Sequence, residues 1–432
     1  MRFARRIIPV SSGKGGVGKT TFALNYALSL AAHGRTVLVD LDTGTSSVRH
    51  SLRTPVTHDL YHFFKKGRRL ADCVTGLDAR LDPQGRFRNF GFVAGPRQMM
   101  DELTNFDRQG RERLIEGINE LEAAFVILDL KAGLDANVIS FLPFSNTGVL
   151  VFTPQLPAAS LAAADIVKSV LFRKLRGLFA EGSRLYTGLD GVTPGFVNTL
   201  LDRAEDAYAP GAGNLDAFVD RLRESLGPHP VVRLVSDAVG SFVVHFVLNC
   251  FNGVNETYSA ALRPFLDRLT SQVSARLDVV NLGWVIAHDA LHQGNVKGVP
   301  ALLRPPATGG AVAAPDARLR QLALQYLDRA APATRAPRAA AAPGRSPDAR
   351  PSRYLEAQLE GLRSMHSDLG TAGYHENFRY ITHRSLHVLS SRRIADFGGT
   401  RIYKDADLLH AFRAAPGATP YQTGRAVDPG SS

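Results

Sequence analysis

RIIPVSSGKGGVGKTT, residues 6–21, joins a short apolar run to a glycine-rich loop and then to the start of a helix. The apolar run is Arg6–Ser11, and apolar residues at helical spacing continue over residues 20–33. Between them, Gly13 to Thr20 matches the pattern G-x-x-x-x-G-K-[ST], in which backbone N–H groups surround the oxygens of a phosphate. Strand, loop and helix in this order predict a phosphate-binding loop at the edge of a parallel sheet.

Each residue type in this loop has a chemical reason. Glycines let the backbone turn its N–H groups inward, and the N-terminus of the following helix adds partial positive charge. We expect Lys19 to reach the β- and γ-phosphates and the Thr20 hydroxyl to bind Mg²⁺. Lys14 is a second lysine near the apex, where it can reach a nucleotide held by another subunit. The predicted nucleotide-binding positions of the loop are Gly13, Lys14, Gly15, Gly16, Val17, Gly18, Lys19, Thr20 and Thr21.

Apolar runs and helical patterns alternate along the chain to about residue 290. Helical patterns cover residues 110–123 and 158–178. This alternation predicts an α/β fold with a doubly wound, mostly parallel sheet. The runs that are typical of buried strands are residues 36–41, 90–93, 125–130, 148–152, 242–248 and 282–286.

The same pattern divides the chain into four parts. Residues 1–330 are predicted to form the domain that carries the loop, with a helical insertion at about residues 176–240, where no buried strand pattern occurs. Residues 331–352 are rich in Ala and Pro and are predicted to be a linker. Residues 353–413 regain apolar residues and are predicted to form a small C-terminal module or docking tail, followed by a disordered end at residues 414–432.

Acidic residues lie at the ends of two predicted strands. Asp40 and Asp42 end the run TVLVDLD, and Asp129 lies near the end of FVILDL. The carboxyl ends of parallel strands share one sheet edge with the phosphate-binding loop. A carboxylate at this edge can hold Mg²⁺ directly or through water, and it can also position an attacking water molecule. All three carboxylates are therefore candidates for these roles.

Composition narrows the functional classes. The 432 residues include 51 Lys and Arg against 40 Asp and Glu, a formal charge of +11, but no block of five like charges occurs. This pattern is typical of solvated faces, and an anionic partner such as DNA or lipid is the alternative.

Cys73 and Cys250 are the two cysteines, which excludes a disulfide scaffold and a four-cysteine metal site within one chain. No run of about 18 apolar residues occurs, so we expect a cytoplasmic protein.

The string KGGVGKTT at residues 14–21 resembles the deviant Walker A motif of the MinD/ParA class of P-loop ATPases. Further stretches fall in the order of that class over most of residues 6–330, and the MinD-like and FlhG-like branch is the most similar. These stretches are VLVDLDTG at residues 37–44, Asp129 with Gly133 four residues later, VFTP at residues 151–154, residues 247–249, and GWVIAHD at residues 283–289.

The resemblance implies a homodimer that forms with ATP and holds two ATP molecules at its interface. Lys14 would then act catalytically across that interface, while Lys19 would be a catalytic residue of its own loop and Asp42 would orient the hydrolytic water. Gly133 would couple the γ-phosphate to a moving segment, and Asn249 would contact the adenine. The implied metal-binding residues are Thr20, Asp40 and Asp129.

These features predict a slow, Mg²⁺-dependent ATPase that switches between monomer and dimer and regulates the position or number of a cellular assembly. Two alternatives stay open: a DNA-binding partition-type ATPase of the same fold, and a non-hydrolysing scaffold that binds nucleotide only to hold a shape. The two cysteines disfavour a role in metal-cofactor assembly. We expect a protein partner at residues 353–413, while DNA and a membrane surface are open alternatives, so the location would be cytoplasmic or peripheral at a membrane or cell pole.

Overall fold

The computed structural model describes most of the chain. The described residues are 5–42, 47–98, 100, 107–143, 145–181, 183, 189–190, 192–205, 214–288, 291, 294, 297–304, 349–369, 373–390 and 397–402. Nearly all of the predicted linker and the predicted disordered end lie outside these residues.

The described strands form one sheet in the order β3-β4-β2-β5-β1-β6-β7-β8. Its neighbouring strands are parallel, except that the short β3 pairs antiparallel to β4. The predicted mostly parallel sheet is therefore confirmed. The strands are β1 (Arg6–Ser11), β2 (Thr36–Leu41), β3 (Thr75–Gly76), β4 (Phe90–Val93), β5 (Phe125–Leu130), β6 (Val149–Phe152), β7 (Val243–Phe251) and β8 (Asp278–Ile286).

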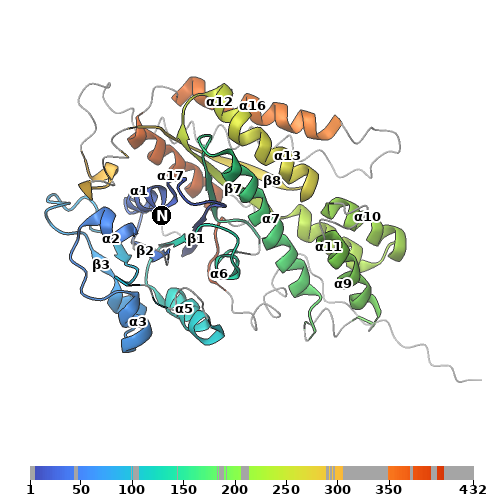
Figure 1. The fold of residues 1–432 in the computed structure, drawn as a ribbon, viewed down its shortest axis with the longest axis horizontal. Helices are drawn as coiled ribbons and strands as arrows, with labels where there is room; N and C mark the ends of the chain where they lie inside the picture. The colour runs from blue at the N-terminus through green and yellow to red at the C-terminus, as the bar shows by residue number, and fades with distance from the viewer. Residues whose placement is uncertain are drawn as a thin grey trace, which may run out of the picture.

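Helices cover both faces of this sheet (Figure 1). They are α1 (Lys19–Leu30), α2 (Ser47–Leu52), α3 (Leu60–Lys66), α5 (Arg108–Glu120), α6 (Ala136–Ser140), α7 (Pro157–Leu178), α9 (Val192–Glu205), α10 (Leu215–Leu226), α11 (Pro230–Gly240), α12 (Val254–Thr257), α13 (Arg263–Gln272), α16 (Ala349–Leu369) and α17 (Tyr374–Ser390). A π-helical turn, Tyr258–Leu262, joins α12 to α13. None of the described helices is both long and apolar enough to cross a bilayer.

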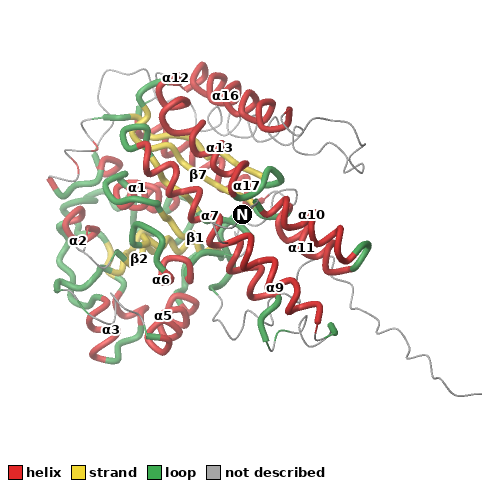
Figure 2. Tube along the Cα trace, turned by 45° about the vertical axis from the view of Figure 1, so that its right-hand side comes forward, coloured by secondary structure: helices red, strands yellow, loops and turns green. Residues whose placement is uncertain are grey.

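The direction of each crossover decides which face a helix covers. Parallel crossovers are right-handed, so the chain places α1 on one face as it moves from β1 to β2, and α7 on the other as it moves from β6 to β7. On the α7 face, α7 packs against α13, and on the α1 face, α1 packs against α17 (Figure 2). Every residue of β1, β2 and β5 is buried, as the continuous apolar runs predicted.

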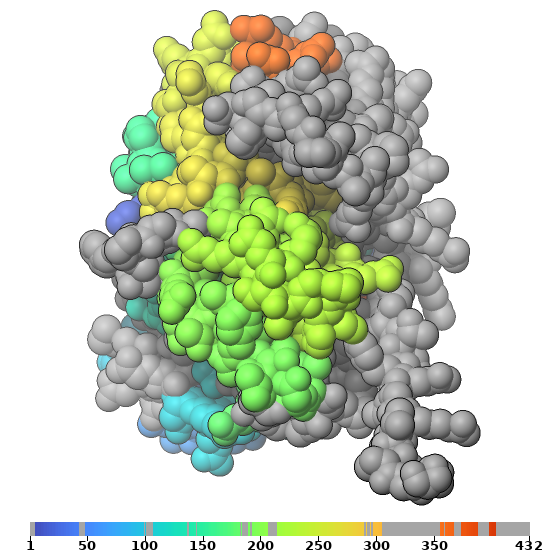
Figure 3. Space-filling model, turned by 90° about the vertical axis from the view of Figure 1, so that its right-hand side faces the viewer, coloured from blue at the N-terminus to red at the C-terminus, as the bar shows by residue number. Residues whose placement is uncertain are grey.

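The predicted insertion is helical in its described residues. After α7 ends at Leu178, the helices α9, α10 and α11 follow before β7, and they form a layer of their own on the surface (Figure 3). One apolar side of α10 is buried, namely Leu215, Phe218, Val219 and Leu222. The Lys174 ammonium of α7 donates to the carbonyl of Ala238 in α11 at 3.0 Å, and burial lowers the pKa of this lysine to about 8. The insertion is thus packed against α7.

The C-terminal helices share the core of the sheet. α17 lies against β8 and α1, where Phe378 stacks on Phe22 at 5.9 Å between ring centroids. Gly283 of β8 has φ +138°, and a Cβ there would lie 2.9 Å from Ile381 of α17, so this glycine permits the close approach. α16 contacts α12 and α13 and buries Leu362 and Met365. The boundaries predicted at residues 330 and 353 stay predictions, yet both helices are packed onto the sheet domain.

A short segment, residues 397–402, crosses the sheet edge opposite to the loop. The backbone N–H groups of Ile7 and Gly399 donate to each other's carbonyls at 2.7 and 2.8 Å. The Asn146 amide also donates to the Gly398 carbonyl at 2.9 Å. Phe397 lies 4.8 Å from the ring of His245, which is fully buried in β7. Neither ring nitrogen of His245 has a hydrogen-bond partner among the described residues.

Stability should fall in acid because of His245. Burial lowers the pKa of His245 to about 3 from an ordinary value of 6.5, so below pH 6.5 the unfolded chain binds a proton that the folded protein rejects. Between pH 6.5 and about pH 5, proton uptake by this histidine in the unfolded chain should lower the free energy of unfolding by about 2 kcal/mol. In urea unfolding at several pH values, His245→Leu should remove this part of the pH dependence, because it removes the titrating group.

The exposed His50 of α2 supplies the matched control. His50→Gln also removes one histidine, and it should keep the acid dependence of the wild type. If His245→Leu and His50→Gln show the same slope between pH 6.5 and pH 5, the buried imidazole is not the cause.

Candidate functional site

The phosphate-binding loop forms a cradle between β1 and α1. Gly16 and Gly18 have φ of +81° and +78°, which turns their N–H groups in directions that other residues rarely reach. Gly18 caps α1, so the amides of the first helical turn face the cradle, as at other helix N-termini that bind anions. Lys14, Gly15 and Gly16 are exposed at the apex, while Val17 and Lys19 are buried.

Lys19 reaches into the sheet edge rather than into solvent. Its ammonium lies 2.5 Å from Asp129 and 3.6 Å from Asp42, and its side chain is 5% exposed. Burial by itself would lower the pKa of Lys19, but the charges of Asp129 and Asp42 outweigh it and raise that pKa. The lysine therefore stays charged, and it holds the carboxyl ends of β2 and β5 against the loop.

Asp40 is the third carboxylate of this edge. Asp40 is the second-to-last residue of β2 and is 1% exposed. Its two oxygens accept the backbone N–H groups of Asp42 at 3.2 Å and of Val48 at 3.4 Å. Burial, and next the charge of Asp129, raise the pKa of Asp40 well above its usual range. A cation at this edge would oppose both causes and favour the ionised carboxylate.

The donor set of this edge suits Mg²⁺. Asp129 is fully buried, and its Oδ2 has no hydrogen-bond partner among the described residues. An unpaired buried oxygen next to a second carboxylate, that of Asp40, is the kind of oxygen donor that Mg²⁺ takes, and Thr20 directly follows Lys19 at the start of α1. Thr20, Asp40 and Asp129 could therefore hold the ion beside the phosphates, as predicted, with water as further ligands.

Two predicted site residues contact the loop itself. Gly133, with φ +103°, donates its N–H to the Ser12 carbonyl at 2.9 Å, so the segment after β5 is joined to the loop. Asn249, at the end of β7, donates from its side-chain amide to the Val17 carbonyl at 2.7 Å. The roles predicted for both residues stay predictions, but the structure places them at the cradle.

Two residues of the site were not predicted from the sequence. The Ser12 hydroxyl donates to the Lys14 carbonyl at 3.0 Å and so ties the start of the loop to its apex. Ala162 of α7 lies against Gly13, where a Cβ would be 2.4 Å from the backbone of Ala162. Ser12 directly precedes the motif in the sequence, so this position could have indicated it as a site residue. Ala162 was not, because nothing local shows which helix crosses the loop.

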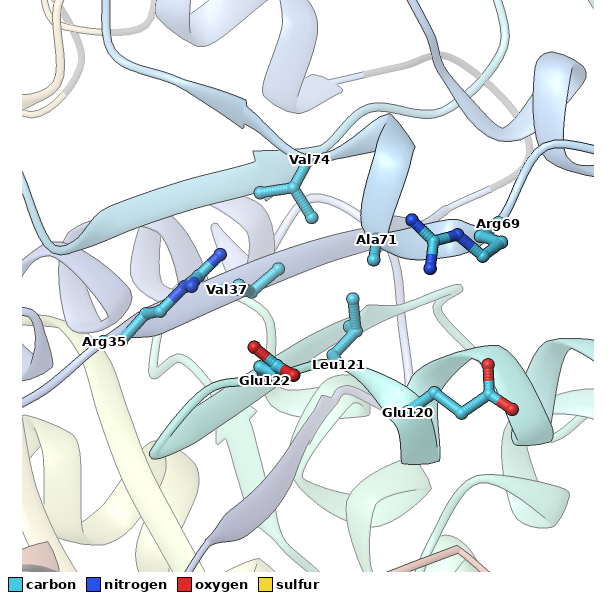
Figure 4. A pocket seen from close by; sticks show the side chains of 8 residues that line it. All are labelled: Arg35, Val37, Arg69, Ala71, Val74, Glu120, Leu121 and Glu122. Carbon is cyan, nitrogen blue, oxygen red and sulfur yellow. The ribbon is translucent and has the colours of Figure 1, made fainter.

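A cavity lined by charged and apolar residues lies elsewhere in the described part of the chain. It has a volume of about 220 Å³ and lies at the start of β2, near the end of α5 (Figure 4). Because the strands are parallel, this position is at the sheet edge opposite to Lys19 and its carboxylates. None of the predicted site residues is part of it. Its lining residues are Arg35, Val37, Arg69, Ala71, Val74, Glu120, Leu121 and Glu122.

The contact between Gly13 and α7 can be tested by adding a methyl group. Gly13→Ala should force the loop or α7 to move, because the new Cβ would lie within 2.4 Å of Ala162. We expect a loss of about 1–3 kcal/mol in the free energy of unfolding. In Gly15→Ala the new Cβ meets no atom within 4 Å, so stability should stay within about 0.5 kcal/mol. Urea unfolding measures both, and equal losses would contradict the close approach.

Parts of this chain are similar to known proteins. The family ParA, described as NUBPL iron-transfer P-loop NTPase, matches residues 4–59, which hold β1, the loop and β2. The chain is 33% identical over 172 residues to the chloroplastic septum site-determining protein minD homolog of Arabidopsis thaliana, covering 38% of this chain and 50% of that protein. It is 27% identical over 175 residues to the septum site-determining protein MinD of Escherichia coli K12, covering 40% and 60%.

The chain thus spans little more than half the length of the curated relatives that it matches. Among solved structures, the septum site-determining protein MinD from Pyrococcus horikoshii, complexed with Mg-ADP, aligns with 71% of this chain and 91% of its own at 16% identity and a TM-score of 0.41. The loop motif and the mostly parallel sheet that carries it give the chain the fold of a P-loop NTPase, and the matches in sequence make it similar to the ParA family over residues 4–59 and to MinD proteins over 38–40% of its length.

Proposed function

We propose that this protein is a slow, Mg²⁺-dependent ATPase that dimerises with ATP and uses hydrolysis to return to the monomer. One observation carries the proposal: the buried Lys19 ammonium lies between Asp129 and Asp42, directly below a glycine cradle with a helix N-terminus. A buried lysine surrounded by carboxylates at the end of a phosphate-binding loop has the charge arrangement that phosphoryl transfer needs.

Each group of site residues has its own role in the proposed hydrolysis of ATP. The loop amides and Lys19 bind the β- and γ-phosphates and neutralise charge as the terminal phosphoryl group leaves. Thr20, Asp40 and Asp129 would hold Mg²⁺, which would supply further charge neutralisation. Asp42 orients the attacking water: an oxygen–phosphorus bond forms to the water oxygen, the bond from the γ-phosphorus to ADP breaks, and the water proton is released. Asp42 is 27% exposed, so water has access to it.

The second lysine supports a role between two subunits. Lys14 is exposed at the loop apex, and no carboxylate among the described residues forms an ion pair with it. A cation exposed at the apex of the loop is suited to a nucleotide on the partner subunit, as an arginine finger is. Two copies facing each other across their loops would each complete the other's site.

The names of the matched relatives suggest the process. The Arabidopsis thaliana and Escherichia coli proteins are both named as septum site-determining proteins. We therefore place the proposed switch among ATPases that position a cellular assembly, with a division site as the first candidate. In this proposal ATP hydrolysis limits how long the dimer lasts, and the useful product is a conformational state.

The dimer can be tested by light scattering after size exclusion, with ADP and with ATP plus Mg²⁺. We expect the mass of the wild type to double with ATP only. Asp42→Ala should hold the dimer for longer, because the water is no longer oriented, and Lys14→Ala should lose it. Release of phosphate, measured in parallel, should be slow in the wild type and at least tenfold slower in either variant, since removing one catalytic group of this kind commonly costs about 10²–10⁴-fold.

The exposed Lys66 of α3 provides the control for loss of a lysine. Lys66→Ala should dimerise and release phosphate as the wild type does. A mass that does not respond to nucleotide, with no phosphate released, would overturn the proposal in favour of a static scaffold. Dimers that assemble on DNA only would favour a partition-type ATPase instead.

A further inference from the structure

Asn249 touches the phosphate-binding loop at its end, at Val17 and Gly18, whereas Ala162 of α7 lies against its first glycine, Gly13. The Asn249 amide donates to the Val17 carbonyl at 2.7 Å, and the side chain is buried. The same amide fills the space next to Gly18, where a Cβ would lie 2.3 Å from its nitrogen. The contact therefore falls on the two residues that lead from the cradle into α1.

An irregularity in β7 supports this contact. Leu248 pairs with Trp284 and Phe251 pairs with Ile286, so β7 contains one more residue than β8 over this stretch. Such a β-bulge changes the direction of a side chain at the end of a strand. Cys250 takes up the bulge with φ +53°, a left-handed conformation that costs a residue with a Cβ about 1 kcal/mol or more.

The residue after the bulge is held in place by two other elements. Phe251 is buried and stacks on Trp284 of β8 at 4.8 Å between ring centroids. The ring of His366 in α16 also lies 5.7 Å from that of Phe251, between centroids. With Leu248 paired in the sheet before the bulge and Phe251 packed after it, the chain between them has little freedom, and Asn249 stays directed at the loop.

We infer that Asn249 is a positioning residue of the phosphate-binding loop, kept in its direction by the strained bulge at Cys250. The inference rests on the proposed function, since it assumes that the loop binds the phosphates of ATP. Asn249 sets the orientation of the Val17 peptide, and with it the entry into α1 at Gly18. It thereby contributes to the binding of phosphate groups, whichever base the nucleotide carries.

A role restricted to the adenine makes a different prediction. A residue that contacts only the base affects the preference for ATP over GTP and leaves the binding of inorganic tripolyphosphate unchanged. A residue that positions the loop affects both nucleotides and tripolyphosphate by a similar factor. Tripolyphosphate with Mg²⁺ is therefore the probe that separates the two roles, because it has phosphates and no base.

Asn249→Asp is the main variant, because it keeps the shape of the side chain and replaces the donor by an acceptor. An acceptor next to the Val17 carbonyl is repelled, and a buried carbonyl is left without its partner. In isothermal titration calorimetry with Mg²⁺, we expect the affinity for tripolyphosphate, ATP and GTP to fall by about tenfold to a hundredfold each. The ratio between ATP and GTP should change by less than about threefold.

Two substitutions at Cys250 test the bulge without changing Asn249. Both remove the thiol, and they differ in their tolerance of positive φ: Cys250→Gly adopts it freely, whereas Cys250→Val is strained there. Cys250→Gly should bind tripolyphosphate as the wild type does. Cys250→Val should lose affinity in the same direction as Asn249→Asp. Thermal unfolding of both variants checks that they are folded at the temperature of the titration.

The outcomes separate this inference from the proposed function. If the wild type binds tripolyphosphate and Asn249→Asp binds it equally well, the positioning role is overturned while the ATPase proposal stands. If Cys250→Val and Cys250→Gly bind alike, the bulge does not direct Asn249, and the inference is overturned in that part. If the wild type binds neither tripolyphosphate nor ATP, both the proposed function and the inference that rests on it are overturned.

Discussion

The ion pair between Lys19 and Asp129 joins the start of α1 to the centre of the sheet, and the site depends on it. Asp129, Asp40 and Asp42 bring three carboxylates to one sheet edge, where two of them are almost completely removed from water. Without a cation these charges would repel each other in a medium that screens them poorly, and breaking a buried pair typically costs about 3–5 kcal/mol. The ammonium of Lys19 is thus a structural element of the fold as well as a candidate phosphate ligand.

The loop is shaped by neighbours from distant parts of the chain. Ala162 of α7 limits the space at Gly13, Asn249 of β7 holds Val17, and Gly133 after β5 binds Ser12. Glycine-rich sequence alone is flexible, because glycine has the largest backbone freedom to lose on folding. The surrounding elements supply the order that the loop sequence cannot, and a preorganised cradle binds phosphate at a smaller entropic cost.

Helices outside the basic strand–helix alternation are built into the same core. The insertion packs against α7, which is also the helix that touches the loop, and Lys174 joins it to α11. α17 completes the face beside α1, and α16 lies next to Phe251 at the end of β7. The insertion and the C-terminal helices therefore contact α7 and β7, the two elements that touch the loop through Ala162 and Asn249. A partner that binds either one would act on a structure that is already connected to the nucleotide site.

The sequence by itself determined the sheet, the loop and the candidate residues, because these depend on local patterns. Continuous apolar runs marked the strands, and β1, β2 and β5 have the predicted bounds. Glycines, Lys19 and the aspartates at strand ends were recognisable because their spacing follows from strand–loop–helix geometry. Contacts between residues far apart in the sequence were decided only by the tertiary structure. The bond from Asn249 to Val17, the closeness of Ala162 to Gly13 and the packing of α17 on β8 depend on how helices and strands approach in space, and no periodicity along the chain encodes that approach.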